Sequence, residues 1–380
     1  MSVDSRAHAI GVFVYVYFFW WVGGIAMYFV RRADYSSGAI FDYAGIERFY
    51  QVNYDYLIFI IAILAAFKFW RVKPGREYFA KKAEISGALS LLVLFALYKL
   101  QAYGLLIFSN DYFSRFNVDA NLIQNAFPNV FLIIALAFIS RREVVSKNHL
   151  AMILFCVVLL SMTGSRTPLF IATMYLLIYY PRLRISARLS FVHFALILLM
   201  LSQFGGLLYN YVRWGGETSL VSIITLVSDL FPEFRHSVIA EYRLARLNTV
   251  EFGGFDWFKN FIAYYLPGFV YTGLGFDRAV YFNSIWNNFF VELIWANPSD
   301  AQYGVRVGLI GETRAVFGSV GVVVIGVLYG VIIRTSRDIV SSLLCLLYTI
   351  PYGLTGLYLL FYVWGFSFIL SLKGRQGKSW

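Results

Sequence analysis

Long apolar runs separated by short polar segments constrain this sequence more than any other feature. A transmembrane helix needs about 20 apolar residues to cross a bilayer. Only 14% of the 380 residues are charged, whereas soluble domains carry roughly 25%, and the mean hydropathy is +0.66. The sequence therefore predicts an all-α polytopic membrane protein of about ten transmembrane helices. The apolar runs lie at roughly 9–30, 54–70, 84–108, 121–140, 149–163, 168–181, 189–212, 315–333, 338–351 and 353–372.

The basic residues between these runs predict the orientation of the chain. With a cytoplasmic N-terminus, the inner segments and the two ends together carry seventeen Lys and Arg residues, against five in the short outer segments. Cytoplasmic segments of membrane proteins carry such an excess. Both termini are therefore expected in the cytoplasm, and the net charge of +11 needs no nucleic acid as a partner.

This orientation places one long segment, residues 213–314, on the outer side. We expect transmembrane helices one to seven in residues 1–212, and the last three with a basic cytoplasmic tail in 315–380. Structureless loops of this length are uncommon, and the segment shows helical patterns at Ser219–Leu230 and Asp256–Leu266. The aromatic content of the second pattern is typical of a helix at a membrane interface.

The outer segment is rich in arginine rather than in positive charge. It contains seven Arg, one Lys and ten acidic residues, so its net charge is −2. A guanidinium group is planar, permanently charged and able to bind phosphate through two parallel hydrogen bonds. The composition therefore indicates phosphate recognition rather than bulk electrostatic attraction. The seven arginines are Arg213, Arg235, Arg243, Arg246, Arg278, Arg306 and Arg314.

One predicted helix, Pro232–Leu247, gathers several of these arginines on one face. On a helical wheel, four basic side chains share an arc of about 100°, and Glu241 lies off that arc. One interpretation is an anion-binding face that carries a group titrating near neutral pH. The other is the solvated face of an amphipathic helix. The four residues are Arg235, His236, Arg243 and Arg246.

Two other arginines are expected at outer ends of transmembrane helices. Arg166 lies in the short turn Thr163–Pro168, where an unpaired and dry arginine is costly. It is a candidate for anion binding, or it extends to lipid headgroups. Arg213 directly follows the seventh apolar run, and the glycine pair before Glu217 allows a ligand to approach the backbone closely. Arg213 is equally consistent with a membrane-interface anchor.

Glu312 and Arg314 precede the eighth apolar run. At a spacing of two they cannot face each other on a helix, but both are expected at its outer mouth. Lys99, inside the third run, is a functional candidate or extends toward the outer interface. Four glycines are expected to let the eighth helix pack tightly against a neighbour: Gly318, Gly321, Gly326 and Gly330.

Several motifs are absent from the sequence. It has no P-loop, no GxGxxG after a strand, no HExxH, no paired-cysteine motif and no Asp-rich metal motif. The two cysteines, Cys156 and Cys345, fall inside predicted transmembrane helices. We therefore expect no cofactor and no metal, and any chemistry would be carried by Arg, Glu, Asp and His at the outer face.

Over nearly the whole chain this layout resembles the O-antigen polymerases of the Wzy type, bacterial inner-membrane enzymes of lipopolysaccharide biosynthesis. The likeness lies in ten-odd transmembrane helices with one dominant periplasmic loop before the last few. The fold is likewise similar to that of GT-C type glycosyltransferases. Local likenesses are Gly164–Thr167 (GSRT), Tyr264–Pro267 (YYLP), and Gly311-Glu312 followed by Phe317-Gly318 and Gly321.

This resemblance implies a metal-independent glycosyl transfer at the periplasmic face. Donor and acceptor would be oligosaccharides linked to undecaprenyl pyrophosphate in the membrane lipid, and a chain-length regulator is a further partner of such enzymes. The candidate bases are His236, Glu217 and Glu312. We predict pyrophosphate binding by Arg166, Arg213, Arg235 and Arg314, with Arg243, Arg246, Arg278 and Arg306 in reserve.

Two alternatives stay open at the level of sequence. An O-antigen ligase would run the same chemistry but transfer the glycan to lipid A core. A polysaccharide-lipid transporter or flippase belongs to another class, and is expected to show inverted repeats and helices broken at mid-membrane. The sequence shows neither of these features.

Overall fold

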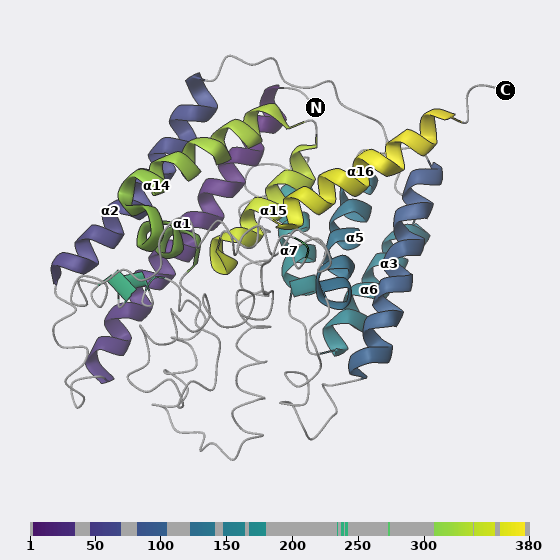
Figure 1. Ribbon diagram of the computed structural model, residues 1–380, viewed down its shortest axis with the longest axis horizontal. Helices are drawn as coiled ribbons and strands as arrows, with labels where there is room; N and C mark the ends of the chain where they lie inside the picture. The colour runs from purple at the N-terminus through teal and green to yellow at the C-terminus, as the bar shows by residue number, and fades with distance from the viewer. Residues whose placement is uncertain are drawn as a thin grey trace.

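The described part of the protein is a bundle of α-helices (Figure 1). The computed structural model describes residues 3–34, 46–69, 82–104, 122–140, 147–163, 167–179, 308–336, 338–353 and 358–376, together with 234, 237, 238, 240, 241 and 273. Its helices are α1 Val3–Asp34, α2 Ile46–Phe69, α3 Lys82–Tyr103, α5 Leu122–Ser140, α6 Lys147–Met162, α7 Thr167–Tyr179, α14 Gly308–Thr335, α15 Ile339–Tyr352 and α16 Tyr358–Gln376.

Each predicted apolar run, apart from 189–212, overlaps one of these helices. Residues 189–212 lie outside the described residues. Helix α2 begins eight residues before the predicted run, at Ile46. Polar side chains of its first turns have partners: Arg48 Nη1 donates to Gln51 Oε1 at 2.6 Å, and Trp21 Nε1 of α1 donates to Asn53 Oδ1 at 2.9 Å.

Three of the helices are long and apolar enough to cross a membrane, namely Arg48–Phe69, Lys82–Tyr103 and Gly308–Thr335. Large apolar side chains are also exposed on them. On α2, Leu57, Ile61 and Leu64 are 40%, 56% and 42% exposed, and their spacing places them on one face of the helix. Such a face is suited to contact with lipid. These features support the prediction of a multi-pass membrane protein. Helix α1 begins and α16 ends on the same side of the bundle (Figure 1).

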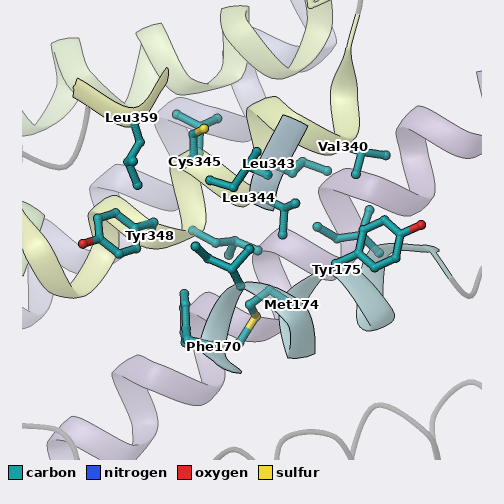
Figure 2. Packing of buried hydrophobic residues seen from close by; sticks show 14 of the residues in the cluster. Phe170, Met174, Tyr175, Val340, Leu343, Leu344, Cys345, Tyr348 and Leu359 are labelled. Atoms are coloured by element: carbon teal, nitrogen blue, oxygen red, sulfur yellow. The ribbon is translucent and has the colours of Figure 1, made fainter. Parts of the chain in front are cut away.

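Helices α5 and α15 fill the interior of the bundle. The side chains from Val130 to Ile139 of α5 and from Ile339 to Ile350 of α15 are buried. Figure 2 shows α15 side chains, among them Leu344 and Tyr348, packing with Phe170 and Met174 of α7. Both cysteines are buried within helices, as predicted.

Helices α2 and α14 approach each other at backbone distance. A Cβ atom added at Gly326 would lie 2.8 Å from Ala62 Cβ and 2.9 Å from the Phe59 carbonyl oxygen. At Gly330 it would collide with the Ile63 carbonyl oxygen. Small residues four apart allow this contact between membrane helices. The predicted tight packing is therefore confirmed for Gly326 and Gly330.

The other two glycines of α14 have a different role. Gly318 has φ 64°, a conformation that L-amino acids with side chains rarely adopt, and α14 kinks there. A Cβ at Gly321 would collide with Phe317 of the same helix, on the other side of the kink. The predicted domain boundary between residues 314 and 315 thus lies within α14, and the path of the helix changes four residues later.

We predict that Gly330→Ala destabilises the protein by separating α2 from α14. The added methyl group must displace backbone atoms, so the free energy of unfolding should fall by about 1–3 kcal/mol. Unfolding by SDS in mixed micelles measures this change. The matched control is Gly365→Ala in α16, where a Cβ atom would meet nothing within 4 Å. Equal effects of the two substitutions would contradict the proposed helix contact.

Candidate functional site

Four charged side chains meet toward the end of the bundle at which α2 and α14 begin. They are Arg48 and Asp55 of α2, Glu241, and Arg314 of α14, and we call them the charge cluster. This is the end that the charge distribution predicts to face outward. Charged groups inside apolar helical bundles are costly unless paired, so their convergence marks this end as the candidate site.

Arg314 is the centre of the charge cluster. Its Nη1 donates to Asp55 Oδ2 and, at 3.1 Å, to Ser319 Oγ. Its Nη2 donates to Glu241 Oε1 at 3.0 Å, and its Nε lies 3.0 Å from Glu241 Oε2. Residues five apart on a straight helix lie about 140° apart around its axis. The kink at Gly318 is what brings Ser319 to Arg314.

Asp55 lies at the base of the charge cluster. Only 1% of its side chain is exposed, against 14% for Arg314. Removing a carboxylate from water costs several kcal/mol, and a well-placed cation offsets much of this cost. Asp55 therefore holds the Arg314 guanidinium at the junction of α2 and α14.

Glu241 comes from a short helical segment, described at Phe234, Ser237, Val238, Ala240 and Glu241 (Figure 1). This segment lies in the predicted helix Pro232–Leu247. Apart from Glu241, its described side chains are fully buried. Positions 234, 237, 238 and 241 follow the i, i+3, i+4, i+7 spacing of one helix face. The segment thus packs one face, which carries Glu241, against the bundle.

Phe234 holds this segment against α1 and α2. Its ring centroid lies 6.2 Å from that of Tyr28, 5.6 Å from Phe49 and 5.3 Å from Tyr56, each in an edge-to-face arrangement, which aromatic pairs favour. A Cβ atom at Gly24 would lie 2.7 Å from Phe234 Cβ, so α1 needs glycine there. These contacts set where the Glu241 carboxylate reaches the cluster.

Glu312 lies at the same end of the bundle, between α14 and the end of α15. Only 3% of it is exposed. A Cβ atom at Gly353 would collide with Glu312 Oε2. Gly353 has φ 74° and donates its N–H to the Thr349 carbonyl oxygen at 2.8 Å, ending α15. Glycine at this position therefore leaves room for the Glu312 carboxylate.

Other polar groups are buried within α14 and α15. The Tyr329 hydroxyl is hydrogen-bonded to Thr349 Oγ1, and both residues are buried. Thr313 Oγ1 is buried and has no hydrogen-bond partner among the described residues. Buried hydroxyl groups normally have partners, so Thr313 is an additional polar group available to a ligand or a water molecule.

Of the predicted site residues, the structure describes Glu312 and Arg314. As expected, both lie at the end of α14 predicted to face outward, and Arg314 binds carboxylates there. Phosphate binding by Arg314 and a catalytic role for Glu312 stay predictions. The other predicted site residues lie outside the described residues: Arg166, Arg213, Glu217, Arg235, His236, Arg243, Arg246, Arg278 and Arg306.

Lys99, the other intramembrane candidate, is 5% exposed. Its ammonium nitrogen lies 5.7 Å from the centroid of the Tyr103 ring, one turn further along α3. This is a cation–π contact. Lys99 belongs to α3, which packs against α5, α6 and α16, whereas the charge cluster is carried by α2, α14 and the segment at Glu241.

The sequence reasoning missed Asp55 and Arg48 as site residues. Asp55 carried a usable signal, because it is an acidic residue inside a helix apolar enough to span a membrane. Glu241 lies off the arginine arc of its helical wheel, and that position corresponds to its contact with the bundle. The identity of its partner, Arg314, depends on which helices are neighbours.

Comparison with known proteins adds no assignment. No protein-family model matches the chain. No curated protein and no solved structure matches it either.

We predict that Asp55→Asn lowers the free energy of unfolding by about 3 kcal/mol, because it leaves Arg314 without its most buried partner. The double variant Asp55→Asn/Arg314→Gln should lose less than the sum of the two single changes, since the pair is removed together. Arg48→Gln, whose side chain is 30% exposed, should cost under about 1 kcal/mol. SDS-induced unfolding measures all four variants, and additive losses would contradict a direct ion pair.

Proposed function

We propose that this protein is a metal-independent glycosyltransferase that polymerises lipid-linked oligosaccharide units at the periplasmic face of a bacterial inner membrane. The proposal includes ten transmembrane helices, cytoplasmic termini and an architecture similar to GT-C type enzymes. The observation that carries it is the meeting of Arg48, Asp55, Glu241 and Arg314, with the buried Glu312 on the same part of α14, at one end of the helical bundle.

The reaction needs two kinds of side chain. The donor glycan is bound to undecaprenyl pyrophosphate, and a hydroxyl group of the acceptor attacks the anomeric carbon. The bond from that carbon to the pyrophosphate oxygen breaks, and negative charge grows on the leaving pyrophosphate. Fixed cationic donors stabilise such charge, often as the largest contribution to catalysis. A base accepts the proton of the attacking hydroxyl.

The described residues include one candidate of each kind. Arg314 presents a guanidinium that Asp55 holds in place, so little reorganisation is needed when charge develops. Glu312 is a buried carboxylate two residues away in sequence, against Gly353. His236 and Glu217 stay alternative bases, and Arg166, Arg213 and Arg235 stay the further pyrophosphate-binding candidates.

The arrangement favours transfer chemistry over transport among the residues that the structure describes. A transporter needs polar groups along a path across the membrane and a site near its middle. Here α5 and α15, which fill the interior, bury mainly apolar side chains. The ion pairs of the charge cluster lie at one end of the bundle.

Polymerisation of a purified lipid-linked repeat unit in detergent with EDTA tests the proposal. We expect a ladder of longer lipid-linked glycans from the wild type. Glu312→Gln should reduce the rate by at least about 100-fold if Glu312 is the base, whereas a similar loss with His236→Ala or Glu217→Gln would assign that role elsewhere. Arg166→Ala and Arg235→Ala should also lose the ladder if they bind pyrophosphate. The matched control is Glu84→Gln, a buried acidic residue in the first turn of α3.

Other outcomes of this experiment would contradict the proposal in distinct ways. Transfer only to lipid A core would identify a ligase. Movement of the intact lipid-linked unit across a vesicle membrane, without any transfer, would identify a transporter.

The proposed orientation has its own test. Alkaline phosphatase fused after residue 250 should be active, because the enzyme folds only outside the cytoplasm. Green fluorescent protein fused after Trp380 should be fluorescent, because the positive-inside rule places the basic tail in the cytoplasm. Inactive phosphatase with a non-fluorescent C-terminal fusion would indicate the inverted topology.

A further inference from the structure

The Glu241 carboxylate occupies the Nε and Nη2 edge of the Arg314 guanidinium, an edge through which arginines in other proteins bind phosphate. Its two oxygens lie 3.0 Å from Nη2 and 3.0 Å from Nε of the guanidinium. Nη2 donates a hydrogen bond to Oε1, whereas Nε is buried and faces Oε2 as an ion-pair contact without hydrogen-bond geometry. This is the edge through which an arginine can bind a carboxylate or a phosphate at two points. The remaining nitrogen, Nη1, is taken by Asp55 and Ser319. Asp55 therefore anchors Arg314, and Glu241 fills its binding edge.

A second arginine faces the same carboxylate. Arg48 Nη1 lies 3.7 Å from Glu241 Oε1, and Gln51 accepts a hydrogen bond from the same nitrogen. The Glu241 carboxylate is thus held between two guanidinium groups. With Glu241 in place the two arginines are balanced by two carboxylates, and without it the remaining three groups carry one net positive charge.

Solvent exposure divides the cluster into an anchored base and an accessible edge. The exposed fraction of the side chain rises from 1% at Asp55 through 14% at Arg314 and 16% at Glu241 to 30% at Arg48. An incoming anion would therefore reach Glu241 and Arg48 before Asp55. Glu241 also belongs to a separate short segment, 73 positions away from Arg314 in sequence, so it can leave without breaking α2 or α14.

We propose that Arg314 and Arg48 form a site for a phosphate or pyrophosphate group, and that Glu241 is its built-in competitor, displaced when the anion binds. Asp55 is a positioning residue that keeps the Arg314 edge directed toward the site. The proposal deepens the proposed function, which supplies the carrier of the pyrophosphate. The site itself rests on the geometry of the four side chains. In the enzyme without a bound donor, Glu241 would occupy the arginine site, and the anionic donor would displace it on binding.

Binding of inorganic pyrophosphate to the purified protein in phosphatidylcholine nanodiscs, without divalent cations, tests the site. Glu241→Gln keeps the shape of the side chain and removes its charge. It should tighten the dissociation constant about tenfold, the factor that 1.4 kcal/mol represents. Arg314→Gln and Arg48→Gln should weaken binding. The control Glu84→Gln removes a buried carboxylate of α3, outside the charge cluster, and should leave affinity unchanged.

The source of the phosphate is resolved by a second arm of the experiment. Farnesyl pyrophosphate replaces inorganic pyrophosphate as the probe. If Glu241→Gln tightens the binding of both probes, the site recognises the pyrophosphate group alone. If the substitution tightens the binding of farnesyl pyrophosphate only, the site binds the headgroup of a prenyl lipid. Unchanged or weaker binding of both probes by a folded Glu241→Gln protein would overturn the proposal.

A measurement on the wild type guards against misfolded variants. Hydrogen exchange at the backbone amides of residues 237–241 should accelerate when pyrophosphate is added, because Glu241 loses its ion pairs. A ligand bound beside an undisturbed Glu241 would slow or not change this exchange, and would overturn the displacement.

The two proposals fail separately. If pyrophosphate displaces Glu241 but no glycan is transferred, the anion site is supported and the polymerase function is contradicted. The competitor role of Glu241 would be contradicted, and the polymerase function retained, by a different result. In that case glycan is transferred, Glu241→Gln does not change the affinity for pyrophosphate, and pyrophosphate does not accelerate hydrogen exchange.

Discussion

The ion pair between Asp55 and Arg314 is the interaction on which the described arrangement depends. A buried carboxylate in an apolar helix is costly unless it is paired, and Arg314 reaches Asp55 only if α2 and α14 are in one register. Gly326 and Gly330 allow that register, because larger side chains would collide with Phe59 and Ile63. The pair and the glycines therefore constrain the same helix contact from its two ends.

The kink at Gly318 divides α14 into two parts with different surroundings. The part after the kink packs on α2 through glycine, whereas the part before it carries Glu312 and Arg314. A straight helix would direct Ser319 away from Arg314. A single glycine with positive φ thus joins a segment that spans the bundle to a segment that presents charge at its end.

Burial distinguishes rigid from replaceable contacts at this end of the protein. Asp55 and Glu312 are enclosed by helices of the bundle, so moving either would disturb packing. Glu241 and Arg48 are more exposed and are joined at 3.7 Å, a looser contact. In the proposed function, the anchored Arg314 would supply a preorganised cation for the donor, and Glu241 would be the contact that the donor replaces.

The sequence by itself determined the apolar runs that became helices, the close packing at Gly326 and Gly330, and the position of Glu312 and Arg314 at one end of a long helix. These follow from hydrophobic length and local spacing, which a linear chain carries directly. Only the tertiary structure decided that Asp55 and Glu241 bind Arg314 and that Gly318 kinks α14. Residues 259 and 73 positions apart meet there, and the period of a helix identifies its faces but not the neighbours that those faces contact.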